Sequence, residues 1–398
     1  MHNPRSFFCL WLQIGLLAAL LTGCVSPPSQ GVQATVAPLP AQVEPVSTNP
    51  VPTTPLATQP ATIPVKRTPL VVFAAGSLIL PFSDLEAAFE AQNPDVDVLS
   101  EYHGSIQVMR HVTDIHEKID VVATADHSLI PMLMYATPDP DTGLPYASWY
   151  IRFAGNRLAL AYTPRSKFAD EISDQNWYEV ITRPGVRLGI ADPRFDASGY
   201  RALMSLNLAE GFYGKPGLLN GVIKDQFEYP ITVFEDDSGT EITVPEILET
   251  KTGSGIVIRG ASIELLALLE SGDLDYAFEY ESVIRQHDLQ MVALPDAINL
   301  GSAAQSQNYD NVVIKLDFRR FASLKPVFRG EPIGYGITIP SNAPQPELAR
   351  RFIEFLLGPQ GRQIMLQNYQ TILDPLQCDG VAHMPPALQA LCQAPVRQ

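Results

Sequence analysis

The stretch LVVFAAGSLILPFSDLEAAFE, residues 70–90, determines the fold class, because an apolar strand passes through small residues into an amphipathic helix. The apolar run in residues 69–75 is typical of a buried strand. Ser83 and Glu86 have the spacing of a capping box for the helix that follows. Between strand and helix, Gly76 and Ser77 either begin a helix or also hold an anion at free backbone N–H groups.

The same order of elements recurs in the next segment of the chain. A strand predicted in VDVLSEYHGS, residues 96–105, leads to Gly104 and Ser105, and residues 106–115 have helical spacing. A third buried strand is predicted in residues 119–126. This β-α-β-α-β order predicts a parallel sheet with helices on both faces, and such sheets bind ligands beyond the carboxyl ends of their strands.

A second unit of the same type begins near residues 157–163. We therefore predict an α/β protein of two lobes with a cleft between them, in which each lobe is a mainly parallel sheet flanked by helices. The second unit is expected to contain a helix from about Asp196, a hairpin in residues 229–245 and a strand–helix–strand segment in residues 255–280. The predicted boundaries are 69–155 plus 281–398 for lobe 1 and 156–280 for lobe 2.

The first 68 residues predict an export signal and a tether. In residues 1–23 Arg5 precedes an apolar run that is too short for a comfortable membrane span but suits a signal peptide. LTGC, residues 21–24, resembles a bacterial lipobox, whose cysteine becomes the lipidated first residue after cleavage. Residues 24–68 contain ten prolines and bury too little apolar surface to fold. We expect a disordered tether from a lipidated Cys24, outside the cytoplasm.

The composition excludes several classes of function. The 398 residues are 46% hydrophobic, enough for a large core, and the net charge of -16 without a basic stripe excludes nucleic-acid binding. His111 and His116 are five residues apart, which is not the spacing of two metal ligands on one helix face, and no G-x-S-x-G elbow indicates a hydrolase. Outside the cytoplasm, Cys378 and Cys392 are expected to form a disulfide rather than a metal pair.

Three strand-to-helix junctions form the candidate site. Free N–H groups and the helix dipole favour anions at such junctions, and serine adds a neutral hydroxyl donor. Each of these residues also fits a plain helix cap. Because all three junctions fall at the expected edge of the sheets, they together favour an anion site. The junctions are Gly76–Ser77, Gly104–Ser105 and residues 196–198.

The order of segments carries a family resemblance. The segments include FAAGSLILPF, YHGSIQVMR, TADHSLIP, ASWYIRFAGNRLALAYT, DPRFDASGYRALM, LLALLESGDLDYAFEYESV and YGITIPSNAP. Together they resemble the archaeal-type branch of the periplasmic solute-binding proteins for molybdate and tungstate, over about residues 69–375. The resemblance implies a two-lobed type II periplasmic-binding-protein fold that closes over one oxyanion and delivers it to an ABC importer. We expect a monomeric, lipid-anchored, non-enzymatic receptor with no cofactor, an ABC permease as its protein partner, and no metal apart from the bound oxyanion.

The resemblance also implies a set of ligand-binding residues, and one position departs from the family. Where the family has a glutamate that completes a six-coordinate metal centre, this chain has Ser262, so Asp196 is the remaining possible direct ligand. Glu264 is a weak substitute, because two residues along a helix point about 200° apart. Five-coordinate or near-tetrahedral binding is therefore expected, and Ser262 also fits a plain N-cap. The expected oxyanion-binding set is Gly76, Ser77, Ser105, Asp196, Ala197, Ser198, Ser262 and Tyr280.

Asp196 also bears on the choice of anion. A carboxylate repels a dianion unless the ligand carries a proton or has a metal atom that accepts a further oxygen, which argues against sulfate. Two alternatives stay open at this point: a receptor for another tetrahedral oxyanion such as phosphate, and an extracytoplasmic enzyme or sensor on the same fold with Asp196 as its acid/base group.

Overall fold

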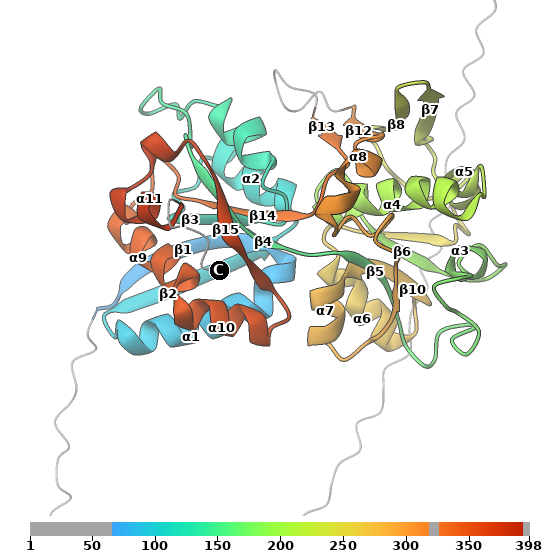
Figure 1. Cartoon of the computed structure of the whole chain (residues 1–398), viewed down its shortest axis with the longest axis horizontal. Coiled ribbons are helices and arrows are strands. Elements are labelled where there is room, and N and C mark those ends of the chain that lie inside the picture. Colours follow the sequence, from blue (N-terminus) through green and yellow to red (C-terminus); the bar gives the residue numbers. More distant parts are fainter. Residues whose placement is uncertain (1–65, 318–325, 393–398) are drawn as a thin grey trace, which may run out of the picture. The chain divides into compact units, whose positions relative to one another are not determined.

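The computed structural model describes residues 66–317 and 326–392 (Figure 1). The predicted signal peptide, Cys24 and all but the last three residues of the predicted tether lie outside the described residues. No helix in the described part of the chain combines the length and the apolar character needed to cross a membrane.

The first lobe is built on a six-stranded sheet in the order β15-β4-β14-β3-β1-β2. The predicted parallel pairing is found between β1 and both β2 and β3. β14 runs antiparallel to β3 and β4, because β4 leads to the second lobe and β14 returns from it. The strands are β1 (Thr68–Ala75), β2 (Val96–His103), β3 (Val121–Thr124), β4 (Tyr150–Gly155), β14 (Gly334–Thr338) and β15 (Thr371–Asp379).

Helices cover both faces of this sheet: α1 and α10 lie on one side and α2 on the other (Figure 1). α1 begins at Ile79, before the predicted capping box at Ser83, because Pro81 is well tolerated in a first helical turn. Cys378 and Cys392 form the expected disulfide, which joins β15 to α11. The helices are α1 (Ile79–Gln92), α2 (Ser105–Thr113), the π-helical turn η2 (Ile130–Tyr135), α9 (Pro346–Leu357), α10 (Pro359–Gln367) and α11 (Pro386–Cys392).

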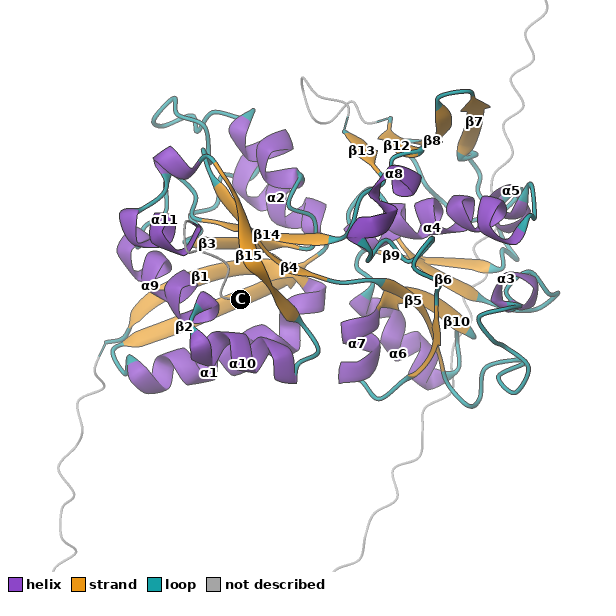
Figure 2. Ribbon diagram, viewed as in Figure 1, coloured by secondary structure: helices purple, strands orange, loops and turns teal. Residues whose placement is uncertain are grey.

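The second lobe contains two sheets (Figure 2). The five-stranded sheet has the order β11-β5-β10-β6-β9, and β6 runs parallel to β9 and β10. The predicted hairpin is β7–β8, which belongs to a four-stranded sheet β13-β12-β8-β7. The strands are β5 (Leu158–Tyr162), β6 (Leu188–Ala191), β7 (Thr232–Asp236), β8 (Gly239–Val244), β9 (Ile256–Arg259), β10 (Tyr276–Tyr280), β11 (Gln290–Ala293), β12 (Val312–Leu316) and β13 (Val327–Arg329).

α4 is the principal helix of this lobe and crosses one face of the five-stranded sheet, while α6 and α7 lie against the other face (Figures 1 and 2). The side chains of α4 from Ala197 to Ala209 are buried. The helices are α3 (Trp177–Val180), α4 (Ala197–Tyr213), α5 (Leu218–Ile223), α6 (Ile263–Ser271), α7 (Glu281–Gln286) and α8 (Ser306–Tyr309).

The strand pairing changes one expected boundary between the lobes. The chain leaves the first sheet between β4 and β5, where the change of lobe was predicted. The predicted return at residue 281 does not match the pairing, because β11 pairs with β5 and β12 pairs with β8. The chain rejoins the first sheet only at β14. Segments 290–293 and 312–316 are short strands whose place is decided by their partners in the second lobe rather than by local sequence.

Candidate functional site

The predicted junctions from the two lobes meet at the carboxyl ends of the strands. Gly76 lies against Ile263 at the start of α6, where an added Cβ would be 3.2 Å from the isoleucine Cγ2. Gly104 lies against Phe195, where an added Cβ would be 2.4 Å from the carbonyl oxygen. Since Gly76 and Gly104 belong to the first lobe and Phe195 and Ile263 to the second, the candidate site lies between the lobes.

Asp196 caps α4 and is the best-bonded member of the site. Its Oδ1 accepts hydrogen bonds from the Ser198 backbone N–H at 2.8 Å and from the Ser198 hydroxyl at 2.9 Å. Its Oδ2 accepts one from the Ser262 N–H at 3.2 Å. Burial nevertheless raises the pKa of Asp196, against the effect of these bonds. The helix-cap hypothesis is therefore correct for Asp196, and the cap joins the start of α4 to the start of α6. Ala197, the next residue, is fully buried in the first turn of α4.

The serines of the first lobe are buried and bonded differently. The hydroxyls of Ser77 and Tyr335 are 2.8 Å apart, and the Tyr335 hydroxyl also accepts a hydrogen bond from Asn156 Nδ2 at 3.0 Å. Ser105 Oγ accepts a hydrogen bond from the Ala125 N–H at 3.0 Å. Because Ser105 Oγ is the acceptor in that bond, its hydroxyl hydrogen remains available to an anion. Neither serine side chain caps a helix.

The first N–H groups of α2 are less free than the sequence predicts. The N–H groups of Ile106 and Gln107 both donate to the carbonyl oxygen of Phe195, at 3.0 and 3.4 Å. The second lobe thus supplies the N-terminal partner of α2. At this junction Ser105 is left as the candidate anion donor.

Tyr280 is held by a buried cation that the sequence does not reveal. Its hydroxyl accepts a hydrogen bond from Arg201 Nη1 at 2.8 Å, and the same nitrogen donates to the Ala125 carbonyl oxygen at 2.7 Å. Burial disfavours the charged form of Arg201, but the neighbouring groups Tyr280 and Asp126 outweigh it, and the net effect raises the pKa of the arginine. Arg201 lies in the apolar helix sequence ASGYRALM, and a sequence-based prediction ordinarily places an arginine at the surface.

A second buried carboxyl group lies next to Ser262. The Ser262 hydroxyl donates to Glu279 Oε1 at 3.1 Å, and the Tyr280 N–H donates to the same oxygen at 2.7 Å. Glu279 Oε2 is buried and has no hydrogen-bond partner among the described residues. Burial raises the pKa of Glu279 to about 8, and the charge of Asp196 adds to the shift. Ser262 is therefore a partner of Glu279 rather than a side-chain cap of α6, and Glu264 is exposed.

A chain of contacts thus joins predicted oxyanion-binding residues of the two lobes. Tyr335, the partner of Ser77, packs against Tyr280 with ring centroids 6.1 Å apart. Tyr280 connects through Arg201 to Ala125 and from there to Ser105. The sequence missed Arg201 and Glu279, since each lies in an apolar segment that periodicity assigns to the core.

Asp126, His127 and Glu331 are close enough to be considered as metal ligands among the described residues. Asp126 already accepts hydrogen bonds from Ser128 and Tyr200 and forms an ion pair with Arg201, so its carboxylate is committed to protein groups. Burial lowers the pKa of His127 to about 4 and raises the pKa of Glu331 to about 7. Because Asp126 is paired with Arg201 and His127 stays neutral, the cluster is better described as a buried ion pair with two neighbouring titratable groups than as a metal site.

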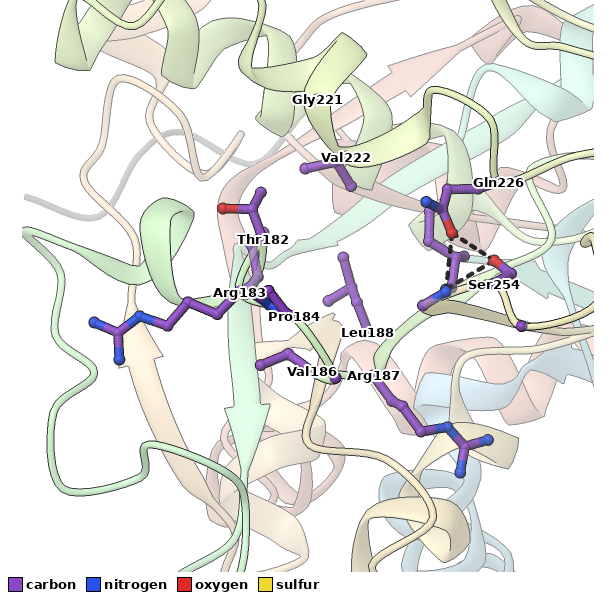
Figure 3. Close-up of a pocket in the computed structure, with 15 residues that line it drawn as sticks. Thr182, Arg183, Pro184, Val186, Arg187, Leu188, Gly221, Val222, Gln226 and Ser254 are labelled. Atoms are coloured by element: carbon purple, nitrogen blue, oxygen red, sulfur yellow. Dashed lines mark hydrogen bonds between the residues drawn. The ribbon is translucent and has the colours of Figure 1, made fainter.

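A separate cavity of about 440 Å³ lies in the second lobe at the amino ends of β6 and β9, opposite the junctions (Figure 3). The side chains of Gln226 and Ser254, which line it, are hydrogen-bonded to each other at 2.8 Å. None of the predicted oxyanion-binding residues lines this cavity. It is therefore not part of the candidate site.

Comparisons with known proteins agree with this architecture. A family model described as bacterial extracellular solute-binding protein matches residues 70–369. The molybdate/tungstate-binding protein WtpA of Thermococcus kodakarensis is 39% identical, over 78% of this chain and 84% of the relative. WtpA of Pyrococcus abyssi is 37% identical, over 78% and 86%. The periplasmic molybdate-binding protein of Azotobacter vinelandii superposes with a TM-score of 0.50 at 16% identity, over 76% of this chain and 99% of that protein, and so shares the fold.

Proposed function

Because this chain belongs to the family of bacterial extracellular solute-binding proteins, we propose that it captures molybdate or tungstate between its two lobes. Its relatives are solute-binding proteins rather than enzymes, and two of them are named for these two anions. The observation that carries the proposal is the set of buried hydroxyls from both lobes, Ser77, Ser105 and Tyr280, around one place between the lobes.

The chemistry of the site supports a metal oxyanion over sulfate. Neutral hydroxyl and backbone donors bind a dianion without a full counter-charge, as helix N-termini do. Asp196 opposes a dianion that cannot use a carboxylate oxygen, whereas molybdenum and tungsten can extend their coordination and accept one. Glu279 retains its proton at neutral pH when its pKa is about 8, so it adds no second like charge.

Calorimetry with sodium molybdate, tungstate, sulfate and phosphate tests this function. We expect tight binding of molybdate or tungstate and weak binding of sulfate. Tight binding of phosphate alone would favour a phosphate receptor, and no binding of either metal oxyanion would refute the proposal. Ser105→Ala should weaken binding by about tenfold, the worth of one buried donor to a charged ligand. Ser205→Ala is the matched control, since Ser205 is a buried serine of α4 whose hydroxyl donates to Ile298 O.

The cellular part of the proposal concerns the N-terminal segment. We propose that Cys24 is lipidated and that residues 24–68 tether the binding lobes to the membrane, where an ABC importer receives the anion. The LTGC sequence after an apolar run and the extracellular family support this. In cells fed an alkyne fatty acid, Cys24→Ser should abolish labelling of the protein and move it from the membrane to the soluble fraction. Labelling that persists in this variant would refute lipidation at Cys24.

A further inference from the structure

The N-terminal part of α4 contacts the first lobe through two consecutive residues. Tyr200 and Arg201 both bond to Asp126, which follows β3 in the first lobe. Tyr200, Arg201 and Asp126 are 1%, 3% and 4% exposed, so the three side chains meet away from water. Arg201 Nη2 lies 3.3 Å from Asp126 Oδ2, and the Tyr200 hydroxyl donates to the same oxygen. A buried charge pair therefore spans the two lobes.

The two oxygens of Asp126 have different partners. Oδ1 accepts from the Ser128 N–H at 2.9 Å and from the Ser128 hydroxyl at 2.7 Å, both within the first lobe. Oδ2 bonds only across the boundary in the part of the chain that the structure describes, to Tyr200 and Arg201. Separating the lobes leaves the Ser128 bonds intact and breaks the others. The bonds from Ser128 thus fix the Asp126 carboxylate within the first lobe, and its Oδ2 contacts the second lobe.

Arg201 connects this contact to the candidate anion site. The nitrogen that donates to Ala125 O, in the first lobe, also donates to the Tyr280 hydroxyl, in the second. Residues 196–198, one turn earlier on α4, belong to the predicted anion-binding set. Because one rigid helix carries both features, the position of the anion site and the contact with Asp126 are mechanically linked.

We propose that Asp126, Tyr200 and Arg201 form an interlobe latch, in which Arg201 is a positioning residue that orients Tyr280 and the three together set how long the lobes stay closed. This inference rests on the proposed function only in one respect, which is that Tyr280 is taken as an anion-binding residue. The latch is formed by protein groups alone and is distinct from contacts with the anion. It favours the closed form with and without the anion, and because an enclosed anion leaves only when the latch opens, it acts mainly on anion release.

Stopped-flow release of molybdate from the purified protein tests the latch. Asp126→Asn and Tyr200→Phe should each speed release by at least about tenfold, with association rates changed less than about threefold, because bonds at a buried interface act mainly on dissociation. Tyr200→Phe removes only the hydroxyl and keeps the ring stacked on Phe328 at 4.2 Å. Its fold should therefore be retained even if Asp126→Asn proves unstable.

Asp120→Asn is the matched control. Asp120 is 1% exposed and precedes β3, but its carboxylate accepts from the N–H groups of Val71 and Gln345 within the first lobe. This control should lower the melting temperature without changing the release rate. Equal release rates in wild type and Tyr200→Phe, or equally fast release in Asp120→Asn, would overturn the latch.

Small-angle X-ray scattering without anion separates failure of the latch from failure of the proposed function. A protein that binds no metal oxyanion refutes the proposed function and leaves the latch testable by this second measurement. The Asp126→Asn and Tyr200→Phe variants should then have a larger radius of gyration than wild type and Asp120→Asn. Equal radii in all four proteins would overturn the latch.

Discussion

Gly104→Ala should weaken anion binding strongly while leaving the separate lobes intact. The backbone of Gly104 has φ -59° and ψ 143°, which alanine adopts without strain. An added Cβ would be 2.4 Å from Phe195 O, whereas ordinary contact begins at 3.4 Å, so α2 and the Phe195 loop must separate by about 1 Å. The 3.0 Å and 3.4 Å bonds from the Ile106 and Gln107 N–H groups to Phe195 O would then exceed hydrogen-bond length.

The expected cost follows from these two interlobe bonds. A net value of about 1 kcal/mol for each gives about 2 kcal/mol, or about 30-fold in affinity for an anion held between closed lobes. Calorimetry with sodium molybdate measures the affinity, and circular dichroism measures the melting temperature without anion, which should change little. Gly211→Ala is the control, because an added Cβ at that position of α4 meets nothing within 4 Å. An unchanged affinity in Gly104→Ala would refute the reasoning that closure brings Phe195 against α2.

Four further predictions concern the carboxyl groups, Ser262 and the disulfide. Asp196→Asn should narrow the preference for molybdate over sulfate by at least about tenfold in calorimetry, because it removes the charge that opposes a dianion; an unchanged ratio would contradict this role. The pKa of Glu279 is raised to about 8, so the folded state holds a proton that the unfolded state has lost, and wild-type stability should fall as pH rises from about 4.5 to 8. Glu279→Gln should flatten this fall in melting temperature, and parallel pH profiles would count against the shift. Ser262→Glu should raise the affinity for tungstate relative to anions that stay tetrahedral, because it adds a coordinating carboxylate. Competition calorimetry measures these affinities, and an unchanged ratio would contradict the coordination argument. Replacing Cys378 and Cys392 by serine should cost about 3 kcal/mol in urea unfolding, given a sequence separation of 14 residues; a loss below about 1 kcal/mol would show that the tail is held by packing instead.

The fold was largely predictable because its signals are local. Continuous apolar strands followed by helices predicted β1–α1, β2–α2 and β6–α4, and the two-lobed type II fold is confirmed by the solved structures that share it. The resemblance to molybdate- and tungstate-binding proteins is confirmed by relatives of that name. Residues 281–317 and 326–329 were assigned to the wrong lobe, since only long-range pairing with strands of the second lobe decides their place.

The candidate site was predictable where it depends on strand ends and unpredictable where it depends on contacts between lobes. Gly104 and Ser105 could be placed at a junction from local sequence, but no local pattern shows that Phe195 occupies the neighbouring N–H groups. The surroundings of Arg201 and Glu279 could not be predicted for the same reason. Each is a charged residue in an apolar segment, and only the packed structure shows whether it is exposed, paired or, as for Glu279 Oε2, buried without a partner.

The net charge of -16 does not oppose anion capture, because charges beyond about 10 Å are screened at ordinary ionic strength. The groups near the site therefore decide, and Arg201 is central among them. Its charge is paired with Asp126, and its Nη1 donates to Ala125 O and to the Tyr280 hydroxyl. The proposed site therefore offers an anion the neutral hydroxyls of Ser77, Ser105 and Tyr280 rather than a free positive charge. Arg201 thus orients Tyr280 and joins the two lobes without adding an unpaired charge to the proposed anion site, and it does so from the helix that Asp196 caps.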